Sequence, residues 1–91
     1  AKKDRRADAR SREESRQARN TIREIEQTIS RLQGEISAIE QALIDPAAAP
    51  SGLSGVAAGE LGRRRAALAR DLETAEIQWL EAHESLEQQV A

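Results

Sequence analysis

The residues of this chain best suited to chemistry are basic, and they concentrate at its N-terminal end. Four arginines recur at steps of four, three and four residues, the spacing that places side chains on one face of an α-helix. We call them the arginine stripe: Arg12, Arg16, Arg19 and Arg23. Guanidinium groups donate paired hydrogen bonds to phosphate oxygens, and a helical row of them can follow a nucleic-acid backbone. The stripe therefore predicts phosphate contacts, provided that a helix extends this far.

Further basic residues surround the stripe, and a second cluster lies far along the chain. They are Lys2, Lys3, Arg5, Arg6 and Arg10 at the N-terminal end, and Arg63, Arg64 and Arg65 in the second cluster. Residues 1–23 hold nine Lys or Arg against four Asp or Glu, a charge of +5, whereas residues 24–91 hold five against twelve, a charge of −7. A basic arm on an acidic body indicates a polyanionic partner.

The same charge pattern has a plainer interpretation. Runs of charge are most often solvated helix faces or linkers, and acidic residues are interspersed in the arm. No aromatic residue and no base-reading motif accompanies the arginines, so any nucleic-acid binding should ignore sequence and weaken with salt. The charge pattern alone leaves a phosphate-binding arm and a mixed-charge helical linker both open.

Catalytic and metal-binding motifs do not accompany these residues. Lysine occurs only at Lys2 and Lys3, so a nucleotide-binding phosphate loop of the Walker type is excluded. His83 is the single histidine and cysteine is absent, which leaves no partner for a metal site or a nucleophile. We therefore expect no catalytic residue, no metal and no cofactor in this chain.

Heptad-spaced apolar residues predict the helix that must carry the stripe. They alternate at steps of three and four along a seam, meaning the row of residues that faces a partner helix: Ile22, Ile25, Ile29, Leu32, Ile36, Ile39 and Leu43. Capping-box pairs put the helix start near Ser11 or Thr21. Pro46 ends it, so we expect a helix over about 15–44 and a turn over 45–59.

A second seam predicts a helix over about 60–90 that folds back on the first. Its members are Leu61, Arg65, Leu68, Leu72, Ala75, Trp79, Ala82, Leu86 and Gln89. A single antiparallel register, in which paired residue numbers add to 104, matches the two seams throughout, for example Ile36 with Leu68. Arg65 then falls opposite Ile39 and should extend outward along its aliphatic stem. We expect the turn end of the hairpin to be the looser one.

The predicted fold is therefore all-α: a two-helix antiparallel intramolecular coiled coil, or helical hairpin, over 15–91 with a basic N-terminal extension. Composition agrees, because one third of the chain is charged and Trp79 is the only aromatic residue. Residues before Glu13 have no helix opposite them in this register, so we expect residues 1–14 to form a basic linker that is frayed or partly disordered. The chain opens with Ala rather than Met and without a signal peptide, so we expect a fragment of a cytoplasmic protein.

The layout resembles the C-terminal coiled-coil domain of ABC-F ATPases, particularly those of the Uup type. The resemblance covers about residues 10–89. The segments that carry it are Ile22-Arg-Glu-Ile25-Glu26, Leu43-Ile-Asp45-Pro46, Ala75-Glu76-Ile77-Gln78-Trp79-Leu80-Glu81 and Glu84-Ser-Leu86-Glu87. The turn departs from the family pattern, because Ala47-Ala-Ala-Pro50-Ser-Gly52 stands where a more aromatic stretch is expected.

This resemblance implies a non-catalytic accessory domain of a cytoplasmic ATPase, with ATP and Mg bound elsewhere in the parent protein. It implies association with DNA, with RNA or the ribosome as further targets. The alternative is a protein-interaction module that docks on its own ATPase domains, on the ribosome or on a second copy, with Ile77 and Leu80 available for self-pairing. We expect no membrane partner and a monomer, with a weak dimer left open.

Overall fold

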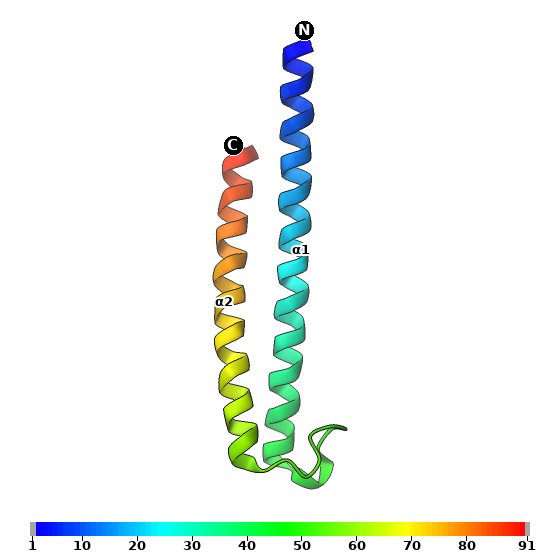
Figure 1. Cartoon of the computed structure of the whole chain (residues 1–91), viewed down its shortest axis with the longest axis vertical. Helices are drawn as coiled ribbons and strands as arrows, with labels where there is room; N and C mark the ends of the chain where they lie inside the picture. Colours follow the sequence, from blue (N-terminus) through cyan, green and yellow to red (C-terminus); the bar gives the residue numbers. More distant parts are fainter. Residues whose placement is uncertain (1, 91) are drawn as a thin grey trace.

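The computed structural model describes residues 2–90, with the side chains of residues 3–89, and consists of two long helices lying side by side (Figure 1). Helix α1 spans Lys2–Ile44 and helix α2 spans Ala58–Val90. The short 3-10 helix η1, Pro46–Ala48, opens the connection between them. The molecule is a rod of 68 × 20 × 14 Å. The predicted all-α antiparallel hairpin is confirmed.

The core is a narrow seam between the helices. Five predicted seam residues are buried: Ile22, Leu32, Ile39, Leu61 and Ala75. The remaining predicted positions from Ile25 to Leu86 are mostly half-buried, because a seam between only two helices stays open to solvent along both sides. Trp79 is one of these half-buried residues. Its ring packs against His83 of the same helix, with 4.2 Å between ring centroids.

The seam changes position at the turn end, where the prediction of Leu43 as a core residue is wrong. Leu43 is 38% exposed, whereas Ala42 is only 2% exposed. The connection accounts for this difference, because its apolar residues pack against α1 on the side of Ala42. Ala42 joins Ile39 and Leu61 in a buried cluster that Leu53 and Val56 cover from the connection. The turn end is therefore not the looser one in its packing.

Helix α1 begins much earlier than predicted. It runs without interruption from Lys2, so the capping boxes at Ser11 and Thr21 lie inside the helix and mark no start. The physical reason is that no glycine or proline occurs before Gly34 to end or interrupt a helix. Fraying of residues 1–14 in solution stays a prediction.

The connection between the helices is fixed by proline and glycine. Asp45 leaves the helical region at φ −137° and ψ 87°, as expected for a residue that precedes proline. Gly52 and Gly55 have φ values of 92° and 78°, which glycine adopts without strain. Helix α2 then begins at Ala58, two residues earlier than predicted.

Candidate nucleic-acid interface

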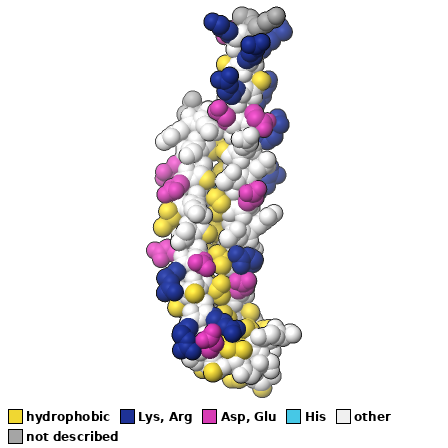
Figure 2. Space-filling model, viewed as in Figure 1, with side chains coloured by type: hydrophobic (Ala, Val, Ile, Leu, Met, Phe, Trp, Pro, Cys, Tyr) yellow, Lys and Arg dark blue, Asp and Glu magenta, His cyan; other side chains and the backbone are white. Residues whose placement is uncertain are grey.

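The basic arm is the N-terminal part of α1, which extends beyond the last described turn of α2 (Figure 1). Figure 2 shows blue side chains of Lys and Arg gathered at this end of the rod, whereas magenta Asp and Glu side chains and further blue side chains are mixed along the rest of it. The predicted arm residues with described side chains are all exposed: Lys3, Arg5, Arg6, Arg10 and Arg12. The side chain of Lys2 lies outside the described ones.

The arginine stripe lies on one face of a continuous helix, as its spacing predicts. Arg5 precedes Arg12 by seven residues and shares this face, so the row is longer than the predicted stripe. The predicted stripe began at Arg12 because Ser11 was the earliest helix start that the capping boxes indicated, and Arg5 was placed among the basic residues around it. At 1.5 Å per residue, the row from Arg5 to Arg23 is about 27 Å long.

Two members of the stripe have partners on their own helix. Nη1 of Arg16 lies 3.0 Å from Oε2 of Glu13, and Nη2 of Arg23 donates a hydrogen bond to Oδ1 of Asn20 at 2.7 Å. Arg12 and Arg19 form neither an ion pair nor a hydrogen bond with the side chains of residues 3–89. The contact of Arg16 is exposed, and such pairs contribute at most about 1 kcal/mol. A phosphate could therefore replace Glu13 at little cost.

A groove of about 570 Å³ lies where the end of α2 meets the stripe, and we call it the end groove. Its lining consists of Ser11, Arg12, Ser15, Arg16, Arg19 and Gln89. Ser15 is only 7% exposed, and Gln89 is the one contribution of α2 to the lining. Ser15 and Gln89 are paired in the predicted register, which could have revealed the groove. The heptad spacing predicted Gln89 only as the last residue of the seam.

The second basic cluster is not part of this surface. It lies near the turn, about 36 Å from Arg16 along the rod. Its members are already paired: Arg63 and Arg64 contact Glu60, and Arg65 contacts Glu40 across the hairpin. The hydrogen bond from Arg64, followed by that from Arg63, lowers the pKa of the Glu60 carboxyl. The structure therefore separates Arg63, Arg64 and Arg65 from the other predicted site residues.

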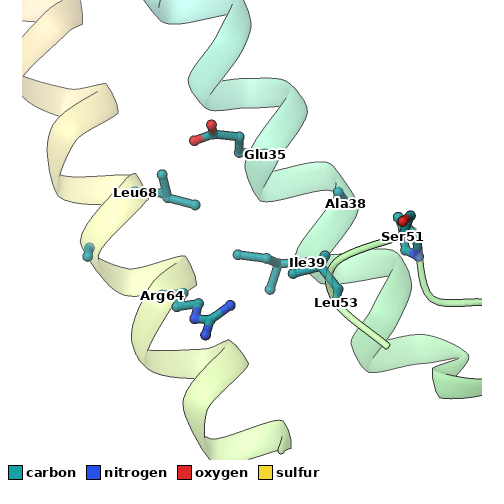
Figure 3. A pocket seen from close by; sticks show the side chains of 9 residues that line it. Glu35, Ala38, Ile39, Ser51, Leu53, Arg64 and Leu68 are labelled. Carbon is teal, nitrogen blue, oxygen red and sulfur yellow. The ribbon is translucent and has the colours of Figure 1, made fainter. Parts of the chain in front are cut away.

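A second groove, of about 520 Å³, lies at the turn end, and we call it the tip groove. Most of its lining is apolar: Ala38, Ile39, Pro50, Leu53, Ala67 and Leu68, with Ser51, Glu35 and Arg64 as polar members. Figure 3 shows Glu35 and Ile39 extending from α1, Leu68 and Arg64 from α2, and Leu53 from the connection. This surface suits an apolar side chain better than a phosphate.

Other kinds of site have little support in residues 2–90. That part of the chain holds no group of three or more His, Asp or Glu side chains that could bind a metal ion. His83 is half-buried against Trp79. Neither described helix has an apolar stretch long enough to cross a membrane.

Comparison with known proteins does not identify a relative of this chain. No family model, no curated protein and no solved structure matches it.

Proposed function

We propose that this chain is a non-catalytic accessory domain that binds nucleic acid, with DNA favoured, through phosphate contacts and without sequence specificity. The observation that carries the proposal is the exposed face of α1 with Arg5, Arg12, Arg16, Arg19 and Arg23. A continuous helix places these guanidinium groups in a row, so several phosphates of one backbone can be contacted at once.

We also propose that the chain is part of a longer protein, an ABC-F ATPase of the Uup type. The sequence resemblance to the C-terminal domain of ABC-F ATPases of the Uup type supports a cytoplasmic ATPase whose other domains bind ATP and Mg. The hairpin fold agrees with that resemblance but is common to many coiled coils. Within this proposal the hairpin supplies binding and the remainder of the parent supplies catalysis.

The test is a fluorescence-anisotropy titration of labelled random-sequence duplex DNA and of a structured RNA. The double variant Arg12→Gln/Arg19→Gln should weaken binding at least about tenfold, because it removes two charge-assisted contacts. Arg31→Gln/Arg70→Gln removes the same charge elsewhere and should change the affinity much less. Equal affinities of the two variants would show that the stripe is not the binding surface. The ratio of the affinities for DNA and RNA indicates which of the two nucleic acids the chain binds preferentially.

A second candidate function is protein interaction, favoured by the apolar tip groove and by two exposed residues of α2. Ile77 is 50% exposed and Leu80 is 54% exposed, and both lie on the outer face of the hairpin. The partner would be the parent's own ATPase domains, a ribosomal component or a second copy. Sedimentation at high concentration tests the self-pairing form: Ile77→Glu/Leu80→Glu should abolish a dimer, and a wild-type monomer argues against it.

A further inference from the structure

We infer that the end groove holds one phosphate group of the bound strand and that α2 takes part in binding through Gln89. This inference rests on the proposed nucleic-acid function and names a site within it. The predicted stripe belongs to α1 alone, whereas the groove needs both helices.

The lining of the end groove consists of hydrogen-bond donors suited to an anion. Arg12, Arg16 and Arg19 border it with guanidinium groups, and the Gln89 carboxamide can donate from the opposite helix. Ser15 adds a hydroxyl from the floor, since it is buried between the helices. A phosphate offers several acceptor oxygens at once, so it can use donors that converge from two helices.

The charge of the groove also favours an anion. None of its six lining residues is acidic, and Glu13 approaches Arg16 from outside the lining. The contrast with the rest of α2 is sharp, because residues 71–87 hold six Asp or Glu and no Lys or Arg. Neutral Gln88 and Gln89 follow this acidic segment, and Gln89 is the only α2 residue in the lining, so α2 contributes no carboxylate to the groove itself.

If both helices contact the ligand, binding requires the end of α2 to be paired with α1. A strand that contacts Gln89 binds only the form in which the last turns of α2 lie against α1. Such a ligand stabilises that form by mass action. Bound nucleic acid should therefore slow hydrogen exchange of the backbone amides near residues 84–89.

The test compares two adjacent glutamines, both exposed, of which only Gln89 lines the groove. Gln89→Glu puts a carboxylate among the three arginines and should weaken binding of labelled duplex DNA at least about tenfold at low salt. Gln88→Glu adds the same charge outside the groove and should have a much smaller effect. Gln89→Ala should cost about threefold to tenfold without changing the salt dependence, because it removes a neutral contact.

The outcomes separate the two proposals. If the wild-type chain binds and the Gln88 and Gln89 variants bind alike, the end groove is not a phosphate site, although the stripe can still be the interface. If the wild-type chain does not bind at low salt, the proposed function and this inference both fail. Circular dichroism of each variant confirms that helicity is unchanged, as expected for exposed positions.

Discussion

Arg65 of α2 and Glu40 of α1 form an ion pair across the hairpin, with 2.7 Å between Nη2 and Oε1. Nε of Arg65 donates to the same oxygen at 3.1 Å. Arg65 occupies a core position of the heptad pattern, yet its side chain extends outward and is 47% exposed. The arginine thereby avoids burial of its charge and connects the two helices beside the Ile39 cluster.

This ion pair should contribute little to stability. In a double-mutant cycle with Glu40→Gln and Arg65→Gln, the coupling free energy of unfolding should be about 0.2–1 kcal/mol, because both side chains are close to half exposed. The coupling should decrease at high salt, where exposed charges are screened. A coupling well above this range, measured by urea unfolding, would mean that the pair is more buried than its geometry indicates.

Adjacent seam positions should respond very differently to truncation. Ile39→Val removes one buried methylene and should lower the free energy of unfolding by about 0.5–1.5 kcal/mol. Leu43→Ala removes more atoms from an exposed position and should cost less than about 0.5 kcal/mol. Urea unfolding followed by circular dichroism measures both values. A larger loss for Leu43→Ala would restore the original heptad assignment and contradict the observed burial of Ala42.

Two glycines inside helices are sites for stabilisation. A Cβ atom added at Gly34 or Gly62 meets nothing within 4 Å. Gly34→Ala and Gly62→Ala should each raise the free energy of unfolding by roughly 0.5–1 kcal/mol, because alanine favours the helix and restricts the unfolded chain. Gly52→Ala is the contrasting variant and should destabilise, since Gly52 has a φ of 92°. Stabilisation by Gly52→Ala in thermal unfolding would contradict the turn conformation.

Glu60 should make stability depend on pH in the acidic range. Its contacts with Arg64 and Arg63 lower the pKa of the folded-state carboxyl below its ordinary value of 4.5. The folded state therefore binds fewer protons than the unfolded chain, and the stabilisation is complete above pH 4.5 and lost as pH falls through the folded value. Wild type should exceed Glu60→Gln in melting temperature at pH 7, and the difference should shrink in acid.

The arginines provide the control for this pH effect. In an Arg63→Gln/Arg64→Gln background the carboxyl loses its donors, so the effect of Glu60→Gln on the melting temperature should depend on pH much less than in the wild type. If the melting temperatures of the wild type and Glu60→Gln differ by the same amount from pH 3 to pH 7, the contacts of Glu60 do not persist in solution.

The heptad pattern was sufficient to predict the hairpin, because two apolar seams on helices joined by a short turn are buried when the helices fold back on each other. The pattern did not predict burial at the turn end or the start of α1, because both depend on residues outside the seams. Leu43 was misassigned because residues of the connection cover Ala42, which no periodicity within α1 reveals. The capping boxes were misleading because a local motif marks a helix start only if the preceding residues are not helical.

The candidate site was predicted in part. Spacing alone places the stripe on one face, and charge alone separates the arm from the body. The end groove was not predicted because it forms where two polar residues, Ser15 and Gln89, meet the arginines of the stripe, and a pattern of apolar residues does not reveal such a hollow. The Arg65–Glu40 pair was missed for a similar reason, since register pairing was considered only for seam positions.

The most direct test of the central claim is the salt dependence of duplex DNA binding by the wild-type chain. If Arg5 and the four arginines of the stripe each neutralise one phosphate, the slope of log K against log salt concentration should be about −4.5. Arg12→Gln/Arg19→Gln should reduce the slope to about −2.7, and the DNA sequence should not matter. An unchanged slope in the variant, or no binding by the wild type at low salt, would contradict the account.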